Sequence, residues 1–270
     1  QGDVIVAGGM ESMTNAPYLL PKARGGMRLG HAEVKDHMFL DGLEDAYEGR
    51  LMGTYAEEVA RSYQLSREMQ DAYAIESLTR AQRASTDGSF ASEIVPVAVK
   101  TRKGEVEIVT DEQPGKADAS KIPTLKPAFA NGGSVTAANS SSISDGAAAL
   151  VLMRLSEAER RGLHPLAAIR GHTSYANAPG LFPTAPVTAI AKLFERTGWS
   201  KTDVDAFEVN EAFAVVAMLA IRELSRIAPA PSADSTSESN VAHSGPSKVA
   251  SASVFSPAKP GAVRLIGTNS

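Results

Sequence analysis

The sequence predicts an α/β fold in which strands alternate with amphipathic helices and form parallel or mixed sheets. Three observations support this prediction. The wholly apolar run 4–7 stops at a glycine pair, as a strand buried on both faces and ended by a tight turn does. Apolar residues recur at helical spacing within 52–88. The apolar run 204–209 then leads through Asn210 into a helix-like run, 213–224.

Length and composition limit the class of protein. A chain of 270 residues exceeds an average domain and predicts two closely packed lobes. The 43% hydrophobic and 21% charged content is typical of globular proteins and argues against global disorder. A net charge of −4 gives no basic field for nucleic acid or an anionic membrane. No apolar run approaches the roughly 20 residues that span a bilayer, and residues 1–3 lack signal-peptide features, so we expect a cytoplasmic protein.

The first half of the chain contains an irregular segment followed by helices and a strand pair. The Pro- and Gly-containing segment 14–40 is expected to leave the sheet and to serve assembly or active-site cover. The first helix has an apolar face made of Met52, Tyr55, Ala56, Val59 and Ala60. Ser66 caps the second helix and Gly88 closes it, and its expected core face is Met69, Ala72, Tyr73, Ile75 and Leu78. Segments 94–99 and 106–109 are expected to pair as strands.

A serine cluster, Ser140 to Ser142, lies between an apolar strand and the apolar run 147–153. Side-chain hydroxyls in such clusters more often satisfy their own backbone than bind a ligand. Both interpretations stay open from the residues alone.

The second lobe is expected to begin at the strand-like segment 166–169, after a short helix over 155–161. A helix that starts near Pro186 and is closed by Gly198 then leads to the strand before Asn210. The mouth of a strand-to-helix turn is where α/β proteins place chemistry. A lone Asn bridges its own turn about as often, so both roles remain open.

Several motifs in order along residues 1–224 resemble the thiolase family, and within it the biosynthetic-type acetyl-CoA acetyltransferases. They are VAGGMESM (6–13), DGL (41–43), MGT (52–54) with AE (56–57), PAF (127–129), VTA (135–137) with Asn139, DG (145–146), GW (198–199) and NEAF (210–213). Each motif alone is weak, but the set in family order and spacing is specific.

The resemblance implies a layered αβαβα fold of two similar lobes with an inserted loop domain. Residues 1–13 and 144–165 would belong to the first lobe, 14–143 to the loop domain that holds coenzyme A, and 166–227 to the second lobe. The loop domain's segment 14–40 resembles the family's tetramerisation region, which implies a homo-oligomer, a dimer or tetramer, for an intact version.

Site residues follow from the matching positions. Asn210 would hold a water that donates into an oxyanion hole, a task that suits a neutral carboxamide. The coenzyme A path would be lined by Leu43, Met52, Phe129 and Ala137; Ser141 would hydrogen-bond the pantetheine, and Ala212 and Phe213 would wall the reacting end. Without the resemblance, Leu43 and Met52 would be assigned to the core. Glu211 is expected to be structural, near a helix N-terminus.

The family's reaction is a reversible Claisen condensation of two acetyl-CoA molecules to acetoacetyl-CoA and CoA, without a metal or other cofactor. It uses a nucleophilic cysteine, a histidine and a second, basic cysteine. This sequence contains no cysteine. We therefore expect no thiolysis by this polypeptide, and the alternative function is a catalytically dead coenzyme A-binding or oligomerisation remnant. A ketosynthase-branch relative is a weaker alternative, because the inserted helices and NEAF match the thiolase side.

The last segment, 228–270, departs from the family. It is rich in Ser, Ala and Pro and shows no helical or strand period, which predicts a disordered or loosely packed tail. His243 is interpreted as a solvated side chain. The N-terminus is expected to be truncated, and a reading-frame change near 222–228 is our hypothesis for the tail; translation of the other two frames without a glycine-rich histidine segment would contradict it.

Overall fold

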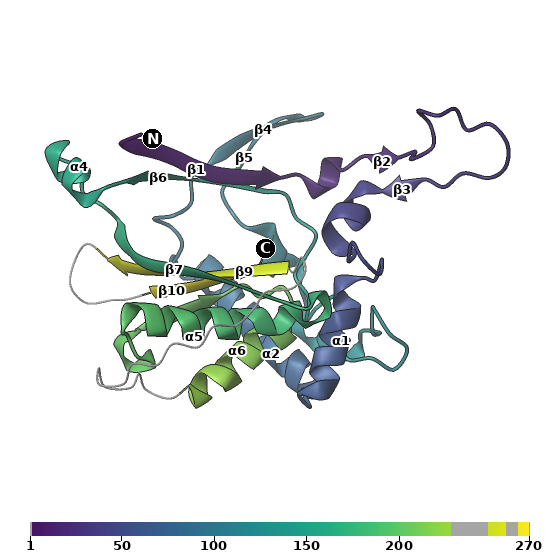
Figure 1. Ribbon diagram of the computed structural model, residues 1–270. Helices are drawn as coiled ribbons and strands as arrows, with labels where there is room; N and C mark the ends of the chain where they lie inside the picture. Colours follow the sequence, from purple (N-terminus) through teal and green to yellow (C-terminus); the bar gives the residue numbers. More distant parts are fainter. Residues whose placement is uncertain (1, 228–247, 258–263, 270) are drawn as a thin grey trace.

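The computed structural model describes residues 2–227, 248–257 and 264–269. Its longer helices lie on one side of a four-stranded sheet. A separate two-stranded ribbon with a projecting arm lies on the other side, together with the short helix over 155–160 (Figure 1). The mixture of strands and helices is the predicted α/β class.

The ribbon consists of β1 (Val4–Glu11) and β6 (Gly146–Met153), paired antiparallel from Val4↔Met153 to Glu11↔Gly146. The prediction that residues 4–7 form a strand buried on both faces and ended by the glycine pair is wrong. The strand continues through both glycines, and Val6 is 70% exposed. Among the described strands β1 pairs only with β6, and all but one of its residues are exposed, so the described part of the chain leaves its faces largely uncovered. Gly8 is required there because a Cβ would lie 2.2 Å from the Ala148 carbonyl oxygen.

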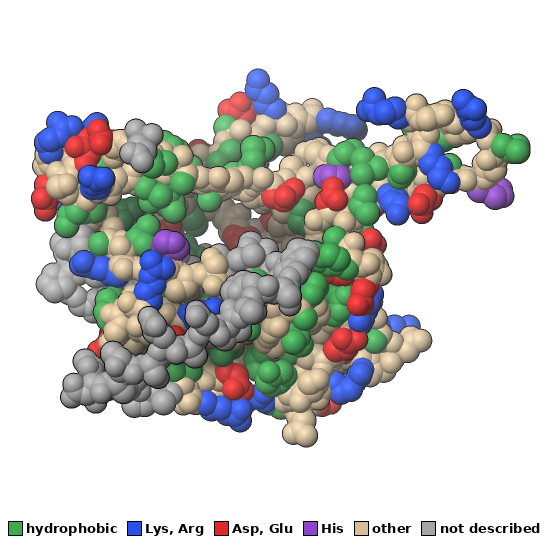
Figure 2. Space-filling model, in the orientation of Figure 1, with side chains coloured by type: hydrophobic (Ala, Val, Ile, Leu, Met, Phe, Trp, Pro, Cys, Tyr) green, Lys and Arg blue, Asp and Glu red, His purple; other side chains and the backbone are tan. Residues whose placement is uncertain are grey.

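An arm projects from the end of β1. It contains a 3-10 turn η1 (Met13–Asn15) and the short antiparallel strands β2 (Tyr18–Leu19) and β3 (Lys35–Asp36), and it returns through a π-helical turn η2 (Phe39–Leu43). Apolar and basic side chains lie along it (Figure 2). This arm is the predicted excursion from the sheet.

Helix α1 (Met52–Ser62) buries Tyr55, Ala56, Val59 and Ala60, as predicted. Helix α2 (Arg67–Thr86) begins where predicted, since the Ser66 hydroxyl accepts from the Met69 amide at 3.3 Å. Its buried face differs from the prediction: Met69 and Ala72 are exposed, and the buried residues are Gln70, Asp71 and Ala74. The Gln70 Nε2 donates to the Leu65 carbonyl (3.0 Å) and to the Ser134 hydroxyl (2.9 Å), and the hydrogen bonds of Asp71 are described below.

Strands β4 (Val97–Thr101) and β5 (Gly104–Ile108) form the predicted hairpin. They are followed by the short helix α3 (Glu112–Lys116) and the 3-10 turn η3 (Ala119–Thr124).

The second half follows the predicted alternation closely. Its elements are α4 (Leu155–Arg160), β7 (Ala167–Asn177), the 3-10 turn η4 (Pro179–Thr184), α5 (Ala185–Thr197), the 3-10 turn η5 (Lys201–Asp203), β8 (Ala206–Val209) and α6 (Ala214–Arg226). Helix α5 ends at Gly198, whose φ of +71° is a left-handed conformation that glycine adopts without strain. Within the described residues no helix combines the length and apolar character needed to cross a membrane.

The sheet is mixed, with strand order β7-β9-β10-β8. Strands β9 (Lys248–Pro257) and β10 (Arg264–Asn269) lie in the segment predicted to lack strands. The structure differs from the prediction because strands pair through backbone hydrogen bonds, which do not require apolar residues to alternate along the strand. Strand β9 pairs antiparallel with β7, and β10 pairs parallel with β8. The rest of the predicted tail, His243 included, lies outside the described residues.

The main core cluster is formed where α1, the 127–140 loop and α6 meet. Its buried members include Val59, Val135, Phe213 and Leu219, and Met52 and Phe129 pack against it. A second cluster joins α5 to the end of α6 through Ile190, Leu193, Phe194 and Leu224. The two clusters attach the helical layer to both the loop and the sheet.

Gly53 permits close packing of α1 on Phe129, since a Cβ there would lie 2.4 Å from three atoms of that ring. We predict that Gly53→Ala lowers the free energy of unfolding by about 1–3 kcal/mol, because the ring must leave its place in the core. Urea denaturation measures this. Gly115→Ala in α3 is the matched control, since no atom lies within 4 Å of its added Cβ; equal losses in both variants would contradict the prediction.

Candidate functional site

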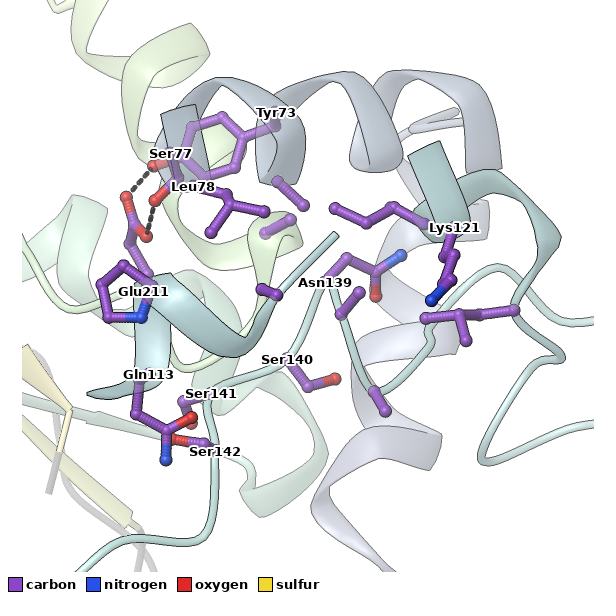
Figure 3. A pocket seen from close by; sticks show the side chains of 18 of the residues that line it. Tyr73, Ser77, Leu78, Gln113, Lys121, Asn139, Ser140, Ser141, Ser142 and Glu211 are labelled. Atoms are coloured by element: carbon purple, nitrogen blue, oxygen red, sulfur yellow. Dashed lines mark hydrogen bonds between the residues drawn. The ribbon is translucent and has the colours of Figure 1, made fainter. Parts of the chain in front are cut away.

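A pocket of about 560 Å³ opens between α2, residues 113–125, the loop 137–142 and the start of α6 (Figure 3). Its polar side chains include Gln113, Lys121, Ser140, Ser141, Ser142 and Glu211. Apolar surface comes from Leu78, Ile122, Leu125 and Ala137. Segments that are distant in sequence therefore form one concave surface.

Glu57 on α1 fixes the beginning of the segment 134–142, the pocket loop. This carboxylate is only 5% exposed and accepts hydrogen bonds from the Ser134 amide (2.8 and 2.9 Å), the Ser134 hydroxyl (3.0 Å) and the Val135 amide (2.8 Å). Several charge-assisted bonds compensate its removal from water. Gly133 leaves room for it, since a Cβ there would lie 2.2 Å from the carboxylate Oε1.

Asn139 closes the same loop from inside. It is 3% exposed; its Oδ1 accepts from the Thr136 amide at 2.7 Å, and its Nδ2 donates to the Ser134 carbonyl (3.0 Å) and to Asp71 Oδ1 (3.2 Å). Asp71 also accepts from Arg67 Nε at 2.6 Å. These bonds explain the polar buried face of α2: its side chains hold the pocket loop.

Arg67 extends this network to the opposite wall. Its Nη2 donates to the carbonyls of Ile122 (3.2 Å), Pro123 (3.4 Å) and Leu125 (2.8 Å). The Arg67 side chain at the start of α2 therefore holds η3. Asp71 connects Arg67 to Asn139 of the pocket loop. Both walls of the pocket thus take their position from α2.

The turn between β8 and α6 is held from two sides. On one side the Ala214 amide donates to the Asn139 carbonyl (2.8 Å), and the Ser141 amide donates to the Ala212 carbonyl (3.0 Å). On the other side the Glu211 carboxylate accepts from the Tyr73 hydroxyl and the Ser77 hydroxyl of α2, both at 2.7 Å (Figure 3). Glu211 therefore acts structurally through α2 rather than by capping α6.

The environment of Tyr73 follows from these contacts. Burial, and next the hydrogen bond to Glu211, raise the pKa of Tyr73 above its ordinary range. The phenol therefore stays protonated at neutral pH and remains the donor in this bond.

The residues proposed from sequence fall into three groups. Ala137 and Ser141 line the pocket. Met52, Phe129, Ala212 and Phe213 belong to or pack on the main core cluster, with the Phe129 and Phe213 rings edge to face at a centroid distance of 6.1 Å. Leu43 ends η2 and Asn210 directly follows β8, and neither is part of the pocket wall. Asn210 is exposed at the strand-to-helix turn where the sequence placed it.

Of the two roles left open from the sequence for the serine cluster, the structure confirms the one within its own loop. The Ser140 hydroxyl donates to the Thr136 carbonyl at 2.7 Å, and the hydroxyls of Ser142 and Ser144 bond to each other at 2.8 Å. Ser140, Ser141 and Ser142 also line the pocket. The cluster therefore stabilises its own loop, and ligand binding by its hydroxyls stays a prediction.

Sequence reasoning missed the buried network of Glu57, Asp71 and Asn139. A signal for Glu57 was present, because this carboxylate follows directly on two residues of the apolar face of its helix. Lys121, which supplies a cation to the pocket wall, was also missed. Within the described residues no group of three or more His, Asp or Glu side chains is arranged to hold a metal ion. The pocket wall thus offers hydroxyl, amide and ammonium groups to a polar ligand.

Comparisons with known proteins agree with the motifs. The family model described as thiolase, N-terminal domain, matches residues 1–156, and that described as thiolase, C-terminal domain, matches residues 163–241. Acetyl-CoA acetyltransferase 1 of Arabidopsis thaliana is 52% identical over 219 residues, which are 80% of this chain and 53% of that protein. Acetyl-CoA acetyltransferase of Rhizobium meliloti is 46% identical over 222 residues, 82% of this chain and 56% of the relative.

Solved structures give the same result. The acetyl-CoA acetyltransferase of Syntrophomonas wolfei aligns with a TM-score of 0.78 at 42% identity, covering 83% of this chain and 56% of that one. The Bacillus anthracis acetyl-CoA acetyltransferase aligns with a TM-score of 0.77 at 40% identity, covering 83% and 57%. The chain spans about half the length of the curated relatives it matches.

The bonds to Glu57 make a direct prediction. Glu57→Gln places an NH₂ group against backbone amides that need an acceptor, so we expect the free energy of unfolding to fall by about 2 kcal/mol. Faster hydrogen exchange at the Ser134 and Val135 amides should accompany the loss. The control is Glu58→Gln, whose side chain is 49% exposed and pairs with Arg50; it should change stability by less than about 1 kcal/mol. A Glu57→Gln protein as stable as that control would show that the buried carboxylate does not anchor the loop.

Proposed function

Because this chain belongs to the thiolase family, we propose that its function is that of an acyltransferase catalysing the reversible Claisen condensation of two acetyl-CoA molecules to acetoacetyl-CoA and CoA. The observation that carries the proposal is the pairing of the loop 139–141 with residues 212–214 beside the pocket. This pairing joins the motif around Asn139 to NEAF, which is more than 60 residues away along the chain. Coenzyme A thioesters are the proposed substrates.

The proposed roles in substrate binding and catalysis are divided between residues near the loop 139–141 and residues near 212–214. Ala137 and Ser141 contact the pantetheine, which is supported by their place in the pocket wall. Ala212 and Phe213 wall the reacting end, and Leu43, Met52 and Phe129 contribute apolar surface; packing of Phe129 on Phe213 supports a rigid wall there. Asn210 follows β8 directly and holds the water of the oxyanion hole. Its carboxamide remains neutral at any pH and offers a fixed dipole to the developing charge.

A second candidate function is coenzyme A binding without chemistry. The observation that favours it is the absence of cysteine from all 270 residues, because the reaction needs one thiolate to carry the acetyl group and another to remove the α-proton. Residues of this polypeptide can bind and orient the thioester, but none can supply a thiolate. Under this alternative, the 270 residues by themselves bind coenzyme A and do not turn it over.

The organisation around the site is also part of the proposal. We assign 1–13 and 144–165 to one lobe, 14–143 to the loop domain and 166–227 to the second lobe; the two family models, which meet between residues 156 and 163, support a boundary there. We propose a cytoplasmic homo-oligomer acting in fatty acid metabolism. Exposed apolar side chains on the projecting arm, Tyr18 at 70% and Leu29 at 101%, support assembly through it (Figure 2).

Binding tests the proposed substrate class. The chain should bind CoA in calorimetric titration, and Ser141→Ala should weaken binding by about three- to tenfold, the worth of one hydrogen bond. Ser144→Ala is the control, because it lies in the same loop but outside the pocket wall. No saturable CoA binding by the folded native chain would sink the proposal, and equal effects of both variants would remove the role of Ser141.

Thiolysis separates the two candidate functions. We expect the purified polypeptide, given acetoacetyl-CoA and CoA, to form no acetyl-CoA above the uncatalysed rate, because no thiolate is present. Loss of the absorbance of the acetoacetyl-CoA enolate measures the reaction, with the Arabidopsis thaliana relative as positive control. Turnover that co-purifies with this chain would show that it is catalytic without cysteine.

A further inference from the structure

The outer edge of β6 is an uncovered strand edge. Among the strands that the structure describes, β6 pairs only with β1, through one of its two edges (Figure 1). Its other edge therefore carries backbone N–H and C=O groups that no described strand pairs. A two-stranded sheet by itself is marginally stable in water, so this edge is suited to receive a further strand.

Both faces of this ribbon are apolar and exposed. Side chains alternate between the two faces along each strand, so Leu150 lies on one face and Val151 on the other. Leu150 is 57% exposed, Val151 is 63% exposed, and Val6, which lies opposite Val151, is 70% exposed. No charged residue or proline occurs within 4–10 or 146–153. Strands of this composition are typical of the interior of a larger sheet.

The hairpin of β4 and β5 is also a two-stranded sheet, but its strands are protected against further pairing. Exposed charged side chains, those of Lys100, Glu105 and Glu107, lie within its strands, and Pro96 directly precedes β4. Charges and proline on an exposed strand edge oppose the addition of another strand. Strand β6 has neither feature, which distinguishes its edge as an interaction surface.

The charges at the two ends of β6 indicate which strand fits its edge. Asp145 directly precedes β6 and Arg154 directly follows it, and both residues are exposed. The Asp145 carboxylate accepts from the Thr14 amide (2.9 Å) and the Ser12 hydroxyl (3.3 Å), and these bonds hold it at the end of the strand without neutralising its charge. Two copies of β6 that run antiparallel bring Arg154 of each copy to the Asp145 end of the other. Both ends of such a pairing therefore join opposite charges.

Strand β1 is less suited to pairing with its own copy. Asp3 directly precedes it and Glu11 ends it, so an antiparallel pair of β1 strands would bring negative charges together at both ends. The charge pattern thus favours a second copy of the chain at the β6 edge over one at the β1 edge.

The sizes of the side chains along β6 fit the same arrangement. When Leu150 lies on a two-fold axis, it meets its own copy, and each small residue on one side of the axis lies opposite a large residue of the other strand. The pairs are Ala149 with Val151, Ala148 with Leu152 and Ala147 with Met153. Small and large side chains that face each other in this way fill space without overlap.

We propose that β6 pairs antiparallel with β6 of a second copy of this chain about a two-fold axis at Leu150, so that two ribbons form one continuous sheet in the order β1-β6-β6-β1. The partner is the chain itself because the edge is complementary to its own copy in charge and in side-chain size. This surface is separate from the projecting arm, and the proposal does not depend on the thiolase reaction.

Disulfide trapping tests the pairing, because the chain has no cysteine of its own. Residues opposite each other in an antiparallel pair bring their Cβ atoms to about 4.5–5.5 Å, close to the separation that a disulfide spans. We expect Leu150→Cys to form a disulfide-linked dimer under mild oxidation at least about tenfold faster than Val6→Cys. Val6 is at least as accessible, but in the proposed sheet it lies about three strand spacings, roughly 14 Å, from its own copy. Non-reducing gel electrophoresis measures both rates; equal rates, or faster cross-linking of Val6→Cys, overturn the proposal.

Sedimentation velocity tests the association without a cross-link. We expect a concentration-dependent species with twice the mass of one chain, and Leu150→Lys should weaken its formation by at least about tenfold, because two ammonium groups would meet on the axis. Val95→Lys is the matched control, since Val95 is 77% exposed and lies outside the ribbon. A native chain that stays monomeric up to about 100 μM, or equal effects of the two variants, overturns the proposal.

Discussion

A carboxylate on the buried face of α1, that of Glu57, determines where the pocket loop lies. The Glu57 carboxylate accepts hydrogen bonds from the amides of Ser134 and Val135 in place of water. A buried carboxylate charge is stable only while such bonds are made. The apolar contacts alone would leave the loop free to slide, because apolar packing has no direction. Directed bonds to a fixed oxygen pair restrict both its position and its course. Gly133 is the steric counterpart of the same constraint.

The β8–α6 connection, which carries Asn210, is positioned by the pocket loop. Backbone bonds attach residues 212–214 to the loop, and Glu211 attaches the other side of the turn to α2. Asn210 itself makes none of these bonds and is positioned through its neighbours. Helix α1 therefore fixes the pocket loop, and the pocket loop fixes the β8–α6 connection. Helix α2 forms hydrogen bonds to both. A side chain for electrostatic catalysis needs this kind of preorganised support, since its benefit is lost if it must reorganise.

The periodic patterns of a sequence predict only those elements that are buried through apolar contacts. Apolar periodicity records burial by apolar contact, and it correctly located α1, α5, α6 and the strand before Asn210. It cannot record burial by hydrogen bonding, so Gln70 and Asp71 were left out of the predicted core face of α2. Nor can it detect a strand that is defined by backbone pairing, as β9 is between β7 and β10. Local patterns likewise do not reveal how many neighbours β1 has. The site residues came from motif resemblance, whereas the network that positions them required coordinates.

Binding and chemistry are physically separable in this architecture. The groups that shape the pocket are satisfied by one another: Glu57 by loop amides, Asp71 by Arg67 and Asn139, and Glu211 by α2 hydroxyls. None of these bonds requires a reactive thiolate, so the wall can form before any nucleophile is brought to it. The opposite dependence does hold, because a thioester must be oriented before attack can be efficient. The shape of the pocket wall therefore depends on these residues alone, and the proposed coenzyme A binding depends on that shape.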